Sequence, residues 1–294
     1  MASTWSGEGN VTLPGAVSYT LSAGNEPTDQ WRVSVAMPPP NLQAIAGPGP
    51  WPALYLLDAP ITFVIAAQTA QTTMAFSLGQ LQPIAVVGIG PATDDLRRID
   101  AHRIRNLTPT TFVPPHLEAR ANHGTGGADG MLDLIVNEIA PYLESQHPLD
   151  PAGRGLGGIS LGGLVTCWAL LTRPTSFRRF LAVSPSLYWD GHLLLDEHRL
   201  PGVPAPDTEV YLAVGEHEED PAYGWPVVPP EMLEVMSDIK MVSETISLAD
   251  RLRRAGTHVR TDIIPDENHA TIWPAAATRG LVHLYATGNQ PGHR

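Results

Sequence analysis

The chain has 294 residues, 43% of them hydrophobic, and a formal net charge of −12 at pH 7. That length and composition suit one large α/β domain with a buried core, and they exclude a wholly disordered chain. The negative charge repels nucleic acids and anionic membranes, so we exclude both as partners.

Strand-like segments recur along the chain. The first, Gln30 to Met37, alternates apolar and polar residues as a half-exposed antiparallel strand does. The next is the continuous apolar run Ala53 to Leu57, which is typical of a parallel strand covered on both faces. Further strands are predicted at Pro83 to Ile89, Leu156 to Ile159, Phe180 to Val183, Val210 to Val214 and Val259 to Ile264.

Helical stretches separate most of these strands. They are Ile61 to Leu78, Met131 to Glu144, Leu161 to Leu171, Met241 to Arg254 and Thr271 to Ala286. Alternating strands and helices predict an α/β fold, in which a mostly parallel central sheet with an antiparallel N-terminal edge carries helices on both faces. We expect a single domain over residues 1–294.

Three segments interrupt this alternation. The Pro/Gly-rich run Pro38 to Pro52 is predicted to be a loop. Residues 90–127 and 216–237 follow the carboxyl ends of predicted strands, where open α/β sheets place their sites. Loops of that length in a compact domain are usually functional, so we expect both to cover the active site, the second as a mobile lid.

The N-terminal residues show no basic segment followed by an apolar one, so no secretory signal is predicted. The longest apolar stretch, Ile61 to Leu78, contains polar residues and is too polar for a membrane span. The single cysteine, Cys167, cannot form an internal disulfide, and we expect it to be a small buried hydrophobic residue. A cytoplasmic location is therefore the default expectation.

A candidate nucleophile lies between a predicted strand and a predicted helix. Gly158-Ile159-Ser160-Leu161-Gly162 matches G-x-S-x-G, and the flanking apolar segments supply the strand–turn–helix setting that the motif requires. In such a turn the hydroxyl of Ser160 projects from the edge of the sheet, and the amide of Leu161 can donate to an oxyanion. The alternative is a Gly-rich turn that holds an ordinary serine.

Serine needs a base to become a nucleophile, and in this fold the histidine follows the last strand. His269 lies there, between the strand that ends near Ile264 and the helix from Thr271. His283 lies inside that helix, and His258 opens the last strand at the wrong end of the sheet. We therefore predict His269 as the base, the alternative being an ordinary loop histidine.

Seven segments together resemble the esterase D-like putative-esterase family of α/β hydrolases, which includes trilactone-siderophore esterases, feruloyl esterases and S-formylglutathione hydrolases. They occur in the family's order between about residues 30 and 285, and the likeness is greatest to the siderophore esterases. The segments are Ala53 to Asp58, Leu107 to Thr110, Gly126 to Asp129, Gly157 to Leu164, Ser184 to Asp190, Val214 to Glu216 and Glu267 to His269.

The resemblance implies a second oxyanion donor after the first of these segments, where the family usually has glycine following the aspartate. Here the residues are Asp58-Ala59-Pro60-Ile61, and proline has no N–H. The second donor is then Ala59 or Ile61, or the hole depends more heavily on Leu161. We take Ile61, with Leu161 as the first donor.

The resemblance also implies an acid in the loop after Val214, three residues beyond the glycine that ends the strand. Counting from Gly215 gives Glu218, which we predict as the third member of a catalytic triad. Glu216, Glu219 and Asp220 are close rivals, and a Ser–His dyad would make all four dispensable.

Other candidates concern the substrate. Tyr188 and Trp189 follow a predicted strand in a region that borders the substrate cleft in the resembling enzymes, although core packing explains them equally well. Arg103 and Arg105 precede the Leu107 to Thr110 segment and could hold a carboxylate or a phenolate-rich acyl group, or they could be solvated or structurally paired loop arginines; of the two we take Arg105 as the substrate contact. His102, His116 and His123 share a loop with acidic residues, but their spacing fits no familiar metal site, so we predict neither metal nor cofactor.

The sequence therefore predicts a serine hydrolase that cleaves a carboxylic ester or lactone, with a small-molecule ester as its partner. An acyltransferase that uses the same acyl-enzyme and a non-catalytic ligand-binding homologue are the alternatives.

Overall fold

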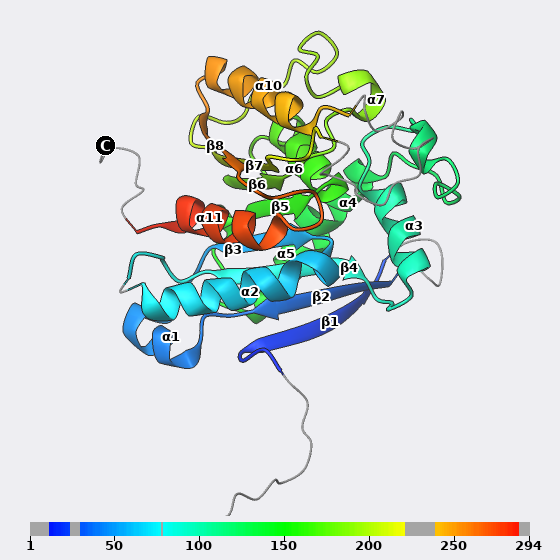
Figure 1. The fold of residues 1–294 in the computed structure, drawn as a ribbon. Coiled ribbons are helices and arrows are strands. Elements are labelled where there is room, and N and C mark those ends of the chain that lie inside the picture. The colour runs from blue at the N-terminus through cyan, green and yellow to red at the C-terminus, as the bar shows by residue number, and fades with distance from the viewer. Residues whose placement is uncertain (1–11, 24–29, 78, 221–238, 288–294) are drawn as a thin grey trace, which may run out of the picture.

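The structure is a computed structural model that describes residues 12–23, 30–77, 79–220 and 239–287. Within those ranges the strands form one eight-stranded sheet in the order β1-β2-β4-β3-β5-β6-β7-β8 (Figure 1). The pairs β1–β2 and β2–β4 are antiparallel, and each later pair is parallel. The strands are β1 (Ala16–Ser22), β2 (Gln30–Ala36), β3 (Ala53–Leu57), β4 (Ala85–Pro91), β5 (Gly155–Ile159), β6 (Arg179–Val183), β7 (Glu209–Gly215) and β8 (His258–Ile264).

Helices cover both faces of this sheet, as Figure 1 shows. Helices α2 and α11 pack together on one face, while α4, α5, α6 and α10 contribute to the core on the other. Among the described residues the helices are α1 (Pro40–Ala46), α2 (Ala59–Phe76), α3 (Leu96–Asn106), α4 (Ala128–Leu134), α5 (Ala140–Gln146), α6 (Leu161–Thr172), α7 (Trp189–His192), α10 (Met241–Arg254) and α11 (Trp273–Tyr285), with the short helices η1 (Pro115–Leu117), η2 (Ile135–Ile139) and η3 (Pro151–Gly153). This is the α/β-hydrolase architecture expected from the sequence.

The two cores follow from the alternation of side chains along the central strands. In β3, Leu54 and Leu56 belong to the core beneath α2 and α11, whereas Tyr55 and Leu57 belong to the other. All five residues of β3 are buried, which is why the strand reads as a continuous apolar run. The carboxyl ends of β3, β5, β6, β7 and β8 therefore meet along one edge of a firmly packed sheet.

Two of the predicted loops contain helices. Residues 90–127 include α3 and the short η1, and residues 38–52 include α1. Helix α3 buries only Ile99 and Ile104 and is otherwise mostly charged, so its sequence has little apolar periodicity. The side chain of Asp95 accepts the amide of Arg97 and caps its N-terminus. A local cap, rather than a broad apolar face, marks this helix.

The edge strand β1 was also absent from the prediction. Its residues alternate between exposed and half-buried positions and none is fully buried, so it lacks the apolar signal of the central strands. Of the predicted lid over residues 216–237, the part from residue 221 onward lies outside the described residues.

Two smaller predictions concern α2 and α6. Within the described ranges, no helix combines the length and the apolar character needed to cross a bilayer. Cys167 lies inside α6 with 1% of its surface exposed, and burial raises the pKa of its thiol. The cysteine is therefore a packed core residue, as predicted.

Candidate active site

Ser160 occupies the sharp turn between β5 and α6. Its backbone has φ 59° and ψ −118°, a region that residues other than glycine seldom adopt, and its amide donates to the carbonyl of Val183 at 3.0 Å. A Cβ at Gly158 would lie 2.7 Å from the backbone of Gly162, and one at Gly163 would lie 2.8 Å from Val183. The small residues of the motif are therefore required by close backbone packing around a strained serine.

The half-buried hydroxyl of Ser160 faces a second serine. Ser160 Oγ lies 3.5 Å from Ser186 Oγ, and the amide of Ser186 donates to the carbonyl of Ser160 at 3.3 Å. Ser186 belongs to the loop after β6, at the neighbouring strand end. Sequence reasoning placed this loop beside the site but did not single out Ser186.

His269 and Glu218 come together from two adjacent strand ends. His269 lies in the turn between β8 and α11, and its Nδ1 is 2.7 Å from Oε2 of Glu218, which follows β7. The other carboxylate oxygen, Oε1, accepts the hydroxyl of Ser184 at 2.5 Å and the amide of Gly215 at 2.7 Å. The Glu218 side chain is 1% exposed, so a fully partnered carboxylate holds the imidazole ring in place.

The neighbouring acids make other contacts. Glu216 accepts the amide of Asp266 at 3.1 Å. Glu219 accepts the amide and the hydroxyl of Ser243 in the first turn of α10, the latter at 3.0 Å. Glu216 and Glu219 therefore connect loops and helix α10, whereas among these acids Glu218 is the one paired with His269.

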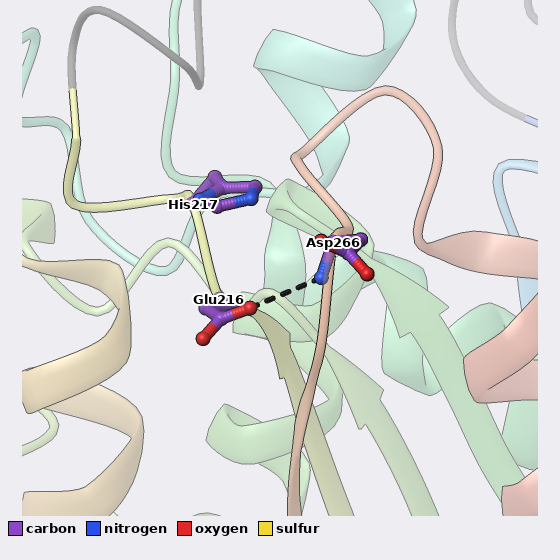
Figure 2. Close-up of side chains that lie close together, drawn as sticks. All are labelled: Glu216, His217 and Asp266. Atoms are coloured by element: carbon purple, nitrogen blue, oxygen red, sulfur yellow. Dashed lines mark hydrogen bonds between the residues drawn. The ribbon is translucent and has the colours of Figure 1, made fainter.

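Glu216, His217 and Asp266 form a cluster of potential metal ligands beside this acid. One donor atom from each lies within 4.8 Å of the others, and Figure 2 shows how they converge from the ends of β7 and β8. Carboxylate and imidazole groups of this kind are able to bind a divalent cation. Two of the three residues are exposed, and the bond from the Asp266 amide to Glu216 already joins the two loops that carry Glu218 and His269. We therefore assign the cluster to loop positioning.

The residues predicted as oxyanion donors lie at two helix starts. Leu161 follows Ser160 as the first residue of α6, and its role as a donor stays a prediction. Ile61 does not fit the second role, because its amide donates to the carbonyl of Asp58 at 2.8 Å and its side chain is 45% exposed. The first turn of α2 thus uses the Ile61 amide for its own structure. Ala59, the other residue considered, is the better candidate.

Of the predicted substrate contacts, Trp189 is contradicted by its burial, whereas the role of Tyr188 stays a prediction. Trp189 is 0% exposed, and its Nε1–H donates to the hydroxyl of Thr110 at 3.0 Å, with Phe112 packed edge-on at a centroid distance of 5.6 Å. Core packing therefore explains Trp189. The hydroxyl of Tyr188 lies 3.3 Å from Nε2 of His116, and burial raises the pKa of this phenol.

Arg105 is half-buried in the last turn of α3, and its carbonyl accepts the amide of Gly127 at 2.9 Å. Its role in substrate binding stays a prediction. Two residues earlier on the same helix, Arg103 forms a two-bond ion pair with the buried carboxylate of Asp58. The sequence suggested Arg103 either as a substrate contact or as a structurally paired arginine, and the structure shows the paired alternative, with a partner 45 positions away that no local pattern indicates.

Residues 24–261 match the Esterase family model, which is described as "Putative esterase". The chain belongs to this family. It is a carboxylic-ester hydrolase with the α/β-hydrolase fold, as the sequence predicted.

Curated relatives of the esterase include several enzymes named for siderophores. The siderophore triacetylfusarinine C esterase of Aspergillus fumigatus is 26% identical over 298 residues, which cover 94% of each chain. The ferri-bacillibactin esterase BesA of Bacillus subtilis is 30% identical over 189 residues, covering 63% of each chain. The esterase therefore resembles the siderophore branch over nearly its whole length.

Solved structures give the same architecture. Siderophore hydrolase EstA from Aspergillus nidulans superimposes with a TM-score of 0.77 at 23% identity, covering 96% of the esterase and 98% of EstA. The BES protein from Bacillus cereus gives a TM-score of 0.75 at 20% identity, with 97% and 100% coverage. These likenesses establish the fold of the esterase.

Proposed function

We propose that the esterase cleaves an ester or lactone bond of a siderophore-type substrate through an acyl-enzyme on Ser160. The observation that carries the proposal is the pairing of His269 with Glu218 at 2.7 Å, at the same edge of the parallel sheet at which β5 ends in the strained turn of Ser160. Ester hydrolysis is the activity of the family, and the siderophore substrate class comes from the names of its relatives.

Each residue has one task in the reaction. Glu218 accepts the Nδ1–H of His269, which fixes the tautomer in which the unprotonated Nε2 acts as the base. His269 takes the proton of Ser160 as Oγ attacks the ester carbonyl carbon, and it returns that proton to the leaving alkoxide oxygen. Water then attacks the acyl-enzyme by the same route and releases the acid.

The negative oxygen of each tetrahedral intermediate needs hydrogen-bond donors. We assign the amide of Leu161 as the first donor and the amide of Ala59 as the second, because Pro60 has no N–H and the Ile61 amide is engaged within α2. These donors act most strongly when the charge develops, so they favour the transition state over the bound ester.

The decisive experiment is a panel of aryl, alkyl, feruloyl and macrolactone esters, the last including trilactone siderophores, assayed with wild type and Ser160→Ala. We expect the wild type to prefer the trilactones and the variant to lose turnover on every member. A fluorophosphonate probe should label wild type at Ser160. Full activity in Ser160→Ala, or a probe adduct elsewhere, would refute the mechanism, whereas preference for a non-siderophore ester would refute only the substrate class.

A further inference from the structure

The turn between β3 and α2 is held in a conformation that its residue does not favour. Asp58, the N-cap of α2, has φ 58° and ψ 44°, the left-handed region that usually belongs to glycine. Its carbonyl accepts the amides of Ile61 and Thr62, at 2.8 and 3.0 Å, so the backbone of the helix start depends on this orientation. Aspartate enters this region more readily than most residues other than glycine, and contacts of its side chain with the rest of the fold add to that local tolerance.

Arg103 supplies that support from α3. Its Nε and NH2 groups donate to the two carboxylate oxygens of Asp58, at 2.7 and 3.1 Å. The two side chains are 17% and 2% exposed, so water screens the pair weakly, and the Asp58 charge raises the pKa of the Arg103 guanidinium. A planar two-bond contact fixes the direction of the carboxylate as well as its position.

The same carboxylate packs against the nucleophile elbow. A Cβ built on Gly162 would lie 3.1 Å from Oδ2 of Asp58 and 3.4 Å from Cβ of Leu57. Gly162 directly follows Leu161, the first oxyanion donor, and Ala59 directly follows Asp58. One buried ion pair therefore contacts both turns from which the oxyanion donors come.

We propose that Arg103 is a positioning residue for the oxyanion hole, acting through Asp58 to hold the β3–α2 turn against the start of α6. The proposal rests on the function proposed above. The Asp58 side chain sets the spacing between the two turns, and Arg103 sets the orientation of that side chain. Loss of the two-bond contact should weaken binding of the tetrahedral oxyanion more than binding of the neutral ester.

The test compares Arg103→Lys and Arg103→Gln with wild type. Lysine keeps the charge but not the planar fork, so we expect kcat to fall roughly 10-fold in Arg103→Lys and about 100-fold in Arg103→Gln, with KM nearly unchanged. Affinity for a trifluoromethyl ketone analogue, which becomes a tetrahedral oxyanion on Ser160, should fall by similar factors.

Arg154→Lys is the matched control. Arg154 makes the same two-bond contact with Glu144, at 2.6 and 2.7 Å, and those side chains are 15% and 12% exposed. It precedes β5, at the opposite end of the strand from Ser160. We expect Arg154→Lys to lower Tm without changing kcat or analogue affinity.

If Arg103→Lys and Arg103→Gln lower Tm but leave kcat and analogue affinity at wild-type values, the pair is merely structural and the proposal is wrong. Should Arg103→Gln fail to fold, Asp58→Asn combined with Arg103→Gln removes the unpaired charge, and this variant should still show the kcat loss. Ser160→Ala distinguishes the two levels, because retained activity there refutes the proposed function, whereas wild-type kcat in the Arg103 variants refutes only the role of Arg103.

Discussion

Two glutamates, Glu218 and Glu244, are both buried, but only the carboxylate of Glu218 has hydrogen-bond partners among the described residues. Glu218 is 6% exposed and receives two donors on one oxygen, Ser184 and Gly215, while its other oxygen faces His269. Glu244, in the first turn of α10, is 4% exposed, and neither of its oxygens has a hydrogen-bond partner among the described residues.

The surroundings of Glu244 favour its neutral form. Burial, and to a lesser extent the charge of nearby Glu219, raise the pKa of this carboxyl to about 7. The backbone amides of Lys240 and Tyr188 favour the charged form without reaching hydrogen-bond geometry. His192 Nδ1 lies 3.3 Å from Oε1 but is not aligned as a hydrogen bond.

The comparison teaches that donors, and not depth of burial, decide what a buried carboxylate is able to do. Glu218 is surrounded by donors that suit a charged partner for His269. Glu244 lies only one residue from Ser243, which binds Glu219, yet it has no such set.

Replacing Ser160 or His269 should have the largest effect on kcat. Ser160→Ala and His269→Ala should each lower kcat on the order of 10⁴-fold or more, and the double variant should lose little beyond the worse single one. Steady-state kinetics on a common aryl ester, with circular dichroism to confirm folding, measures this. Additive losses would show that the two residues do not act as a unit.

Glu218→Gln keeps the shape of the side chain but removes its charge, and glutamine could orient the histidine in the wrong tautomer. We expect kcat to fall roughly 10²- to 10⁴-fold with little change in KM. Glu216→Gln and Glu219→Gln are matched controls in the same loop, and each should stay within a few-fold of wild type. A Glu218→Gln enzyme as active as its controls would favour a Ser–His dyad.

Glu244→Gln should leave kcat within a few-fold of wild type and change the pH dependence of stability instead. Because the pKa of Glu244 is raised in the folded state, its contribution to stability is full at low pH and is lost as pH rises through about 7. Between pH 5 and pH 8 the wild type should therefore lose roughly 1–3 kcal/mol more unfolding free energy than the variant. Urea unfolding at both pH values measures this, and equal losses in the two proteins would contradict the assignment.

Chelation of divalent metal ions should have no effect on kcat. The cluster of Glu216, His217 and Asp266 adjoins Glu218, but we assign it to loop positioning, so EDTA should leave kcat unchanged. Loss of activity on chelation, restored by one divalent ion, would show that the cluster binds a metal ion that the reaction requires.

The local sequence pattern was sufficient to predict the strands that are buried along their whole length. The apolar runs predicted β3 and β5, and the Gly-rich motif after β5 located Ser160 in a turn that the structure shows to be strained. The resemblance to the esterase family, counted from Gly215, selected Glu218 among four acids, and Oε2 of Glu218 lies 2.7 Å from Nδ1 of His269 in the structure.

Contacts between residues far apart in the chain could not be predicted from the sequence. Trp189 was predicted to border the substrate cleft, but in the structure its N–H donates to Thr110, 79 residues earlier, and the side chain is buried. The Ile61 amide looked available because a helix start cannot be located to one residue from sequence. The partner of Arg103 could not be predicted, because only the folded chain brings this residue to Asp58.

The sealed position of Cys167 has a practical use. It is the single cysteine of the chain, and it lies within α6 with its thiol protonated and 1% of its surface exposed. Maleimide reagents need a thiolate that they can reach, so the native protein is close to a cysteine-free background. A cysteine introduced at an exposed position such as Leu96, which is 78% exposed at the start of α3, would therefore accept a fluorophore selectively. Such a labelled enzyme would report by fluorescence on the surroundings of α3 during turnover, without any prior removal of native thiols.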